Sequence, residues 1–119
     1  AGASKDQAKN DGATPLFHAS QTGHSEVVQV LLAAGASKDQ PMNDGATPLI
    51  VASYSGHSEV VQVLLAAGAS KNQAKNDGAT PLFHASQTGH SEVVQALLAA
   101  GASKDQAKND GATPLFHAS

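Results

Sequence analysis

With 119 residues, 3 % aromatics and neither tryptophan nor cysteine, the chain has the length of one domain and must build its core from Ala, Leu and Val. Its net charge of −3 sets ten carboxylates against seven basic residues, all lysine, so it lacks the basic field and the arginines that hold nucleic acid. Without cysteine it can form no disulfide or thiolate metal site, and with no apolar run of about 20 residues to enter a membrane we expect a soluble, cytoplasmic or otherwise intracellular protein.

Internal repetition dominates the sequence, because the tripeptide Asp-Gly-Ala recurs every 33 residues. It begins at Asp11, Asp44, Asp77 and Asp110. We therefore predict a single array over 1–119 that consists of a partial repeat (1–10), three full repeats (11–43, 44–76 and 77–109) and a partial repeat (110–119). A period of this length is typical of solenoids, in which each unit covers the apolar face of its neighbour.

Each full unit is predicted to contain two short helices, as its first copy illustrates. Thr14 followed by Pro15 is typical of a helix start, with Thr as the N-cap and Pro at a position that needs no N–H. Gly23 can adopt the left-handed conformation that ends this helix. A second helix is expected to begin near Ser25 and to end at Gly35, because its valines and leucines form one helical stripe.

The segment 36–44 has no apolar periodicity and ends in the turn signal Asn-Asp-Gly, so we predict an extended arm that leads into the next unit. Neither predicted helix could stand alone, since isolated helices of fewer than about 12–15 residues are marginal in water. Stacking of successive units provides the missing apolar contacts.

Three sequence blocks, taken in order, are similar to the ankyrin repeat: 44–49 (DGATPL), 56–61 (GHSEVV) and 64–69 (LLAAGA). The same blocks recur from Asp11 and Asp77, so the chain resembles the ankyrin repeat family over its whole length. The resemblance implies an all-α repeat solenoid, an L-shaped stack of helix pairs with hairpin-like arms. It also implies a concave surface, formed by arms and first helices, on which partner proteins dock.

The chain departs from the family pattern in three ways. The position after Thr-Pro-Leu, usually His, is Phe17, Ile50, Phe83 and Phe116. The next position, usually aliphatic and inward-facing, is His18, His84 and His117, with Val51 in the central unit. Serine replaces the usual Leu after Gly-His at Ser25, Ser58 and Ser91. If these serine positions are buried, each exchange would cost about 2–5 kcal/mol, so looser packing is expected.

The histidines do not predict a metal site. His24, His57 and His90 recur once per layer, and layers about 10 Å apart cannot share an ion that needs bonds of about 2.0–2.1 Å. We interpret each as a hydrogen-bonding bridge between loops of its own layer, and we expect no metal and no cofactor.

Catalysis is not expected either. Asp11, His18 and Ser20 form a triad by composition only, because nothing in the repeat supplies an oriented base or an oxyanion hole. A line of lysines along the arms, interleaved with acids, is interpreted as a solvated edge, the alternative being a patch for an acidic partner. The residues in question are Lys38, Asp39, Lys71, Lys104 and Asp105.

The places where repetition fails are the most specific signal. The full units depart from the majority residue at eight positions, six of them within 41–55; the eight are Pro41, Met42, Ile50, Val51, Tyr54, Ser55, Asn72 and Ala96. We predict a partner-binding patch centred on Pro41, Met42, Tyr54 and Ser55, together with Gln21 and Gln87 at the position of Tyr54 in the flanking units. The alternatives are drift after duplication, or core compensation by Ile50 and Val51.

The sequence therefore predicts a protein–protein interaction module with an unknown partner, and not an enzyme. The alternative is a structural or self-associating scaffold whose uncapped repeats stack end to end, since such contacts need not close. An engineered or excised array fragment would show the same near-identity of units.

Overall fold

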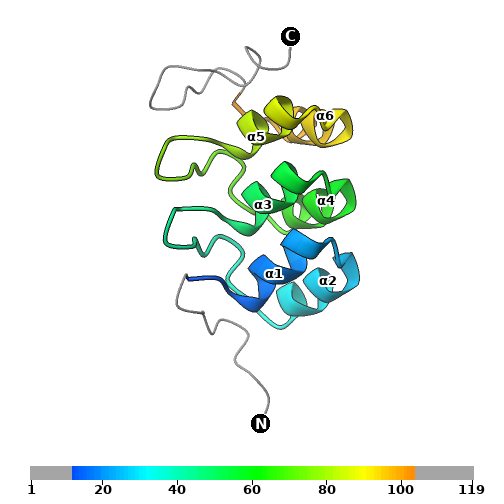
Figure 1. Ribbon diagram of the computed structural model, residues 1–119. Coiled ribbons are helices and arrows are strands. Elements are labelled where there is room, and N and C mark those ends of the chain that lie inside the picture. Colours follow the sequence, from blue (N-terminus) through cyan, green and yellow to red (C-terminus); the bar gives the residue numbers. More distant parts are fainter. Residues whose placement is uncertain (1–11, 104–119) are drawn as a thin grey trace.

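The computed structural model describes residues 12–103, which form three stacked helix pairs and contain no strand (Figure 1). The helices are α1 (Pro15–Thr22), α2 (Ser25–Ala33), α3 (Pro48–Ser55), α4 (Ser58–Ala66), α5 (Pro81–Thr88) and α6 (Ser91–Ala99). The expected all-α helix-turn-helix solenoid is confirmed. The predicted partial repeats 1–10 and 110–119 lie outside the described residues.

The first helix of each unit begins and ends as the sequence predicts. Thr14 is extended, and its hydroxyl accepts a hydrogen bond from the Phe17 N–H at 3.2 Å, with Pro15 in the first turn. Gly23 follows the helix in the left-handed region at φ 79°, a conformation that costs a residue with a Cβ about 1–2 kcal/mol. The same capping residues recur in α3 and α5, so the three short helices begin and end by the same local interactions.

The second helices carry a glutamate in the first turn, where a negative charge is favoured by the helix dipole. The first of them ends at Ala33, two residues before the predicted stop at Gly35. Gly35 then takes φ 90°, and the Ala36 N–H donates back to the Leu31 carbonyl at 3.0 Å. Glycine is therefore needed just after the helix, to reverse the chain into the arm.

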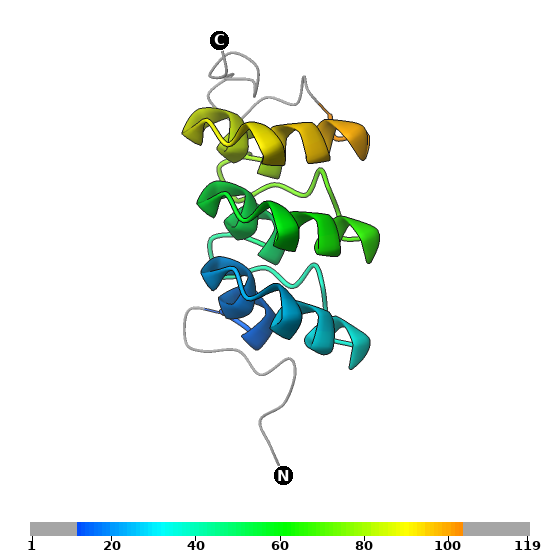
Figure 2. The same cartoon turned by 90° about the vertical axis from the view of Figure 1, so that its right-hand side faces the viewer.

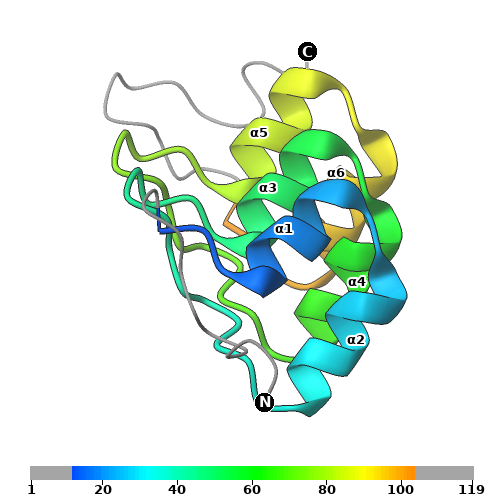
Figure 3. The same ribbon diagram turned by 60° about the horizontal axis from the view of Figure 1, so that its bottom comes forward.

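The helices form two rows, with α1, α3 and α5 facing the arms and α2, α4 and α6 behind them (Figures 2 and 3). The core lies between the rows and includes Leu49, Val61 and Leu64, each at most 1 % exposed. Stacking completes this core, because Val60 is 1 % exposed whereas its counterpart in the first unit, Val27, is 48 % exposed.

A second, smaller apolar cluster lies beneath the arms. It joins Phe17, Ile50, Ala13 and Ala46, with Met42 and Val51 packed against it. Phe17 and Phe83, which replace the usual family histidine, are thus buried, at 5 % and 1 % exposed. This departure fills space with apolar surface and does not loosen the fold.

The arms are hairpin-like, as the resemblance implied. In the arm that precedes α3, the Met42 N–H donates to the Ala46 carbonyl at 2.8 Å, and the Gly45 N–H donates to the Met42 carbonyl at 2.9 Å. The Asp44 carboxylate accepts from the Ala46 N–H at 2.9 Å, which fixes the turn. Consecutive arms are joined by the Asn76 N–H, which donates to the Asp44 carbonyl at 2.9 Å.

The histidine ladder connects layers, so the prediction of bridges within each layer is wrong for two of its members. The His57 Nε2 lies 3.0 Å from the Gln21 carbonyl, and the His90 Nε2 lies 3.0 Å from the Tyr54 carbonyl, each in the preceding unit. The His24 ring differs, since its Nδ1 lies 2.7 Å from the Thr22 hydroxyl of its own unit. The ring of His57 fits against the preceding unit because Gly23, after the first helix of that unit, has no side chain. A Cβ on Gly23 would lie 2.7 Å from the His57 ring.

The serines that replace leucine also connect layers. The Ser58 hydroxyl donates to the Glu92 carboxylate of the next unit at 3.2 Å, and Ser25 donates to Glu59 in the same way. Ser25 and Ser58 are half-buried and Ser91 is exposed, so the cost considered for a buried position does not arise. Polar contacts between units take the place of an apolar one.

Candidate functional site

A pocket of about 390 Å³ opens between the arms and the first helices in the middle of the stack. Its helical wall comes from all three layers: Phe17 and Gln21 of α1, Ile50, Val51 and Tyr54 of α3, and His84 of α5. Its other wall comes from two consecutive arms: Met42, Asp44, Ala46 and Lys75. We call this feature the central pocket; it needs all three units to form.

The structure brings three of the six predicted site residues to the central pocket, namely Gln21, Met42 and Tyr54. The other three lie outside its lining. Pro41 is exposed on the arm, Ser55 is half-buried at the end of α3, and Gln87 is exposed on α5. Their part in binding stays a prediction.

Tyr54 is an exposed aromatic residue of the central pocket, with 54 % of its surface exposed. Its ring meets the His84 ring edge to face, with centroids 5.5 Å apart and an interplanar angle of 80°. Its backbone is held as well, because its carbonyl lies 3.0 Å from the His90 Nε2. The ring is therefore supported on one side while the rest of its surface faces solvent.

His84 is a pocket residue that the sequence prediction of the patch missed. It is 9 % exposed and also meets the Phe83 ring, with centroids 5.9 Å apart. The signal was available, because His84 occupies in the third unit the place that Val51 occupies in the central unit. A change at one layer alters the contacts of the layer above it, so neighbours of a changed position belong to the same site.

Two charged groups border the central pocket, and the sequence prediction missed both. The Asp44 side chain is 58 % exposed and that of Lys75 is 25 % exposed, with Asp44 Oδ2 3.9 Å from Lys75 Nζ. At this distance and exposure the pair contributes at most about 1 kcal/mol to stability. Lys75 stands where the preceding arm has Met42, so an apolar and a cationic side chain occupy equivalent places on the two arms.

A family model described as ankyrin repeats (3 copies) matches residues 1–75 and 67–119, which together span the whole sequence. The chain belongs to the ankyrin repeat family. Ankyrin repeats are generally protein–protein interaction modules, and the ankyrin fold is an interaction fold and not an enzymatic one. A comparison with curated proteins gives no match.

No helix between residues 12 and 103 has the length and apolar character needed to cross a membrane.

Ser20 and His18 of the first ankyrin unit do not form a nucleophile–base pair. Ser20 is 0 % exposed, and its hydroxyl has no hydrogen-bond partner within the described part of the chain. His18 lies two residues earlier on the same helix, and positions two apart on a helix do not face each other. Asp11, the third member considered, lies outside the described residues. Across 12–103 no group of three or more potential ligands could hold a metal ion.

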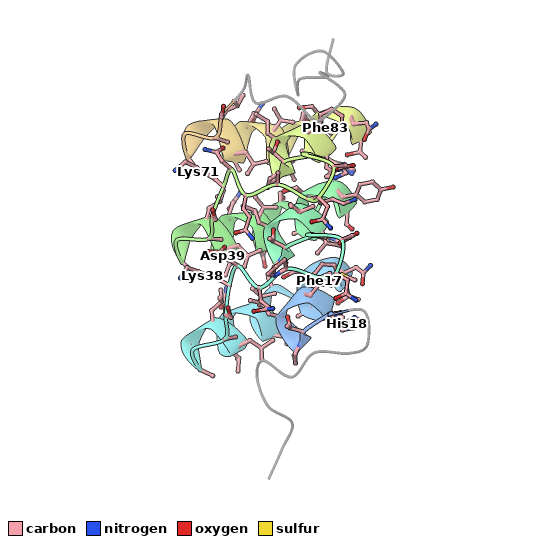
Figure 4. The ribbon with its side chains drawn as sticks, turned by 90° about the vertical axis from the view of Figure 1, so that its left-hand side faces the viewer. Phe17, His18, Lys38, Asp39, Lys71 and Phe83 are labelled. Atoms are coloured by element: carbon pink, nitrogen blue, oxygen red, sulfur yellow. The ribbon has the colours of Figure 1, made fainter. Side chains whose placement is uncertain are left out.

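Lys38 and Lys71 of the ankyrin arms occupy a separate column from Phe17 and Phe83 (Figure 4). Lys38 and Lys71 are half-buried, and their stems lie near Gly68 and Gly101 of the following unit. Asp39 accepts a hydrogen bond from the Ser70 N–H at 2.8 Å, so this edge also helps to join layers. Lys104 and Asp105 lie outside the described residues.

Proposed function

We propose that this ankyrin array binds another protein at the central pocket. The observation that carries the proposal is that the non-repeating positions of the sequence and the lining of the pocket coincide. Of the eight positions where the full units depart from the majority residue, four line this one pocket: Met42, Ile50, Val51 and Tyr54. Drift without selection would scatter such changes over all faces of a unit.

The pocket residues suit protein recognition. An exposed aromatic ring near the centre of an interface contributes more binding energy than its neighbours, and Tyr54, which is 54 % exposed in the middle unit, would have that position. Met42 is half-buried, and its flexible thioether can adapt to a partner's shape. Pro41, Ser55, Gln21 and Gln87 would then form a rim around this centre.

Catalysis is not part of the proposal, and neither is a cofactor. The titratable side chains that line the pocket are Asp44, Lys75, His84 and Tyr54, and the lining contains no serine or threonine hydroxyl that they could activate as a nucleophile. The absence of cysteine from the sequence supports an intracellular location, where disulfides are rare.

Isolation of a partner followed by a binding measurement tests the proposal. A partner is isolated by proximity cross-linking to the full chain, and its affinity is then measured for the native chain, Tyr54→Ala and Gln62→Ala. Gln62 is exposed on α4, behind the pocket, and is the matched control. We expect at least about a tenfold loss for Tyr54→Ala and none for Gln62→Ala. Full affinity of the Tyr54→Ala chain would overturn the proposal.

A self-associating role is the second candidate, and exposed valines on α2 support it. Val27 and Val30 are 48 % and 67 % exposed, whereas Val60 and Val93, at the position of Val27 in the next two units, are each 1 % exposed. A second copy could cover this face in the way that one unit covers another. Sedimentation over a hundredfold concentration range tests it, and a monomer at every concentration rules it out.

A further inference from the structure

We propose that the partner segment carries a bulky apolar side chain next to a lysine or arginine. The apolar side chain enters the central pocket and the cation lies against Asp44. This inference rests on the proposed function and adds the chemistry of the ligand to it.

The apolar half of the ligand follows from the buried floor of the pocket. Ile50 is 2 % exposed and Phe17 is 5 % exposed, and both belong to the apolar cluster beneath the arms. Met42, Val51 and Tyr54 continue this surface upward to solvent. A volume of about 390 Å³ accommodates a side chain of the size of Leu, Met or Phe. A small or polar side chain would leave the apolar floor of the pocket in contact with water, so it would contribute little binding free energy.

The cationic half follows from the charges at the rim. The Asp44 side chain is more than twice as exposed as that of Lys75, at 58 % against 25 %, so the carboxylate is the more accessible charge. Its Oδ1 is engaged by the Ala46 N–H at 2.9 Å, whereas Oδ2 lies 3.9 Å from the Lys75 ammonium, beyond normal hydrogen-bond length. An incoming ammonium or guanidinium can therefore approach Oδ2 directly.

The charges around the central pocket also favour a cationic ligand. Asp77 holds the position of Asp44 on the next arm and is also exposed, so two carboxylates and one lysine stand along this stretch of the arms. The whole chain carries a net charge of −3. A cationic segment is attracted at long range and at the rim, whereas an acidic segment meets only Lys75 among the described residues that line the pocket.

The chain contains its own reporters for this site. Met42 is the only methionine and Tyr54 the only tyrosine of the sequence, which has no tryptophan, and both side chains line the central pocket. A single methionine methyl resonance and the tyrosine fluorescence therefore report binding at this pocket in the unaltered protein.

Selection from a library of random nonapeptides on the immobilised full chain tests the proposal. We expect the enriched peptides to share Leu, Ile, Met or Phe within a few positions of Lys or Arg. The most enriched peptide is synthesised with two variants, one with alanine in place of the apolar residue and one with glutamate in place of the cation. The parent peptide should shift the Met42 methyl resonance, the alanine variant should bind at least about tenfold more weakly, and the glutamate variant about fivefold more weakly.

Two protein variants assign the charge contact. Asp44→Asn keeps an oxygen for the Ala46 N–H, so the turn is preserved, and it should abolish the preference for the cationic over the glutamate peptide. Lys75→Gln is the matched control and should leave or enlarge that preference. Circular dichroism confirms that both variants fold.

Enrichment of acidic peptides, binding without a Met42 shift, or a cation preference that survives Asp44→Asn would each overturn the proposed ligand chemistry, and so would a library that yields no binder. The proposed function is tested separately, because its partner either loses or keeps its affinity for Tyr54→Ala whatever the library returns. A partner that depends on Tyr54 but carries no cation at the contact would leave the function standing and refute the chemistry.

Discussion

The second helices at the back of the stack and the central pocket differ in how closely their residues follow the repeat. The second helices repeat SEVVQ and LLA in every unit, and their contacts repeat with them. The stretch 41–55 holds most of the departures from the repeat, and the central pocket lies there. Copying therefore builds a stack in which each layer supports the next, whereas a site with its own chemistry needs residues that are not copied.

Contacts between neighbouring units supply stability that a single unit lacks. A histidine reaches back to a carbonyl beside a glycine, a serine reaches forward to a glutamate, and a valine is covered by its neighbour. Stability in such a stack is approximately a sum of unit and interface contributions. Variants at equivalent positions of different units can therefore separate the contribution of an interface to the free energy of unfolding from the contribution of a unit.

The largest difference between layers is expected for glycine to alanine exchanges. Gly56→Ala should lose about 3 kcal/mol or more in the free energy of unfolding, because a Cβ at φ 78° would also lie 2.7 Å from the His90 ring. Gly89→Ala, at φ 77° with nothing within 4 Å among the described residues, should lose about 1–2 kcal/mol. Urea denaturation measures both, and equal losses would show that the histidine contact is not tight.

A valine pair gives the next largest effect. Val60→Ala should lose about 2 kcal/mol, because the side chain is 1 % exposed and its removal leaves a cavity between layers. Val27→Ala, at the same position of the first unit and 48 % exposed, should lose less than about 1 kcal/mol. Thermal or urea unfolding compares the two variants, and a larger loss at Val27 would contradict the direction of stacking.

The polar link between layers should contribute less. Glu92→Gln should lose about 0.5–1 kcal/mol, because its carboxylate accepts the Ser58 hydroxyl bond at 3.2 Å near the surface. Glu26→Gln is the control, since it occupies the same helix position but receives no serine bond within residues 12–103. The same denaturation experiment applies, and an equal effect at both sites would assign the stabilisation to the helix dipole alone.

The smallest effect on stability is expected at the binding site itself. Tyr54→Gln installs the residue of the flanking units at a position that is 54 % exposed, so the free energy of unfolding should change by no more than about 0.5 kcal/mol. A loss of 2 kcal/mol or more in urea denaturation would mean that Tyr54 serves the stability of the stack and is not kept for binding.

Local signals in the sequence were sufficient for the fold. Thr14, Pro15 and Gly23 act within one helix, so their roles can be predicted without a structure, and the 33-residue period supplies the stacking. The direction of the His57 bond was not predictable in this way, because a period does not say which neighbouring loop a side chain reaches. Nor was the place of Asp44 and Lys75 at the central pocket, which depends on how the arms are positioned over the first helices.

Reversal of the non-repeating stretch tests the central claim most directly. One chain receives the repeat residues at all six positions: Pro41→Ala, Met42→Lys, Ile50→Phe, Val51→His, Tyr54→Gln and Ser55→Thr. A control chain receives them at the two remaining departures, Asn72→Asp and Ala96→Val. Calorimetric titration with the isolated partner should show an affinity loss of at least about a hundredfold for the first chain and none for the control. Unchanged affinity of the first chain, with its fold intact, would contradict the account.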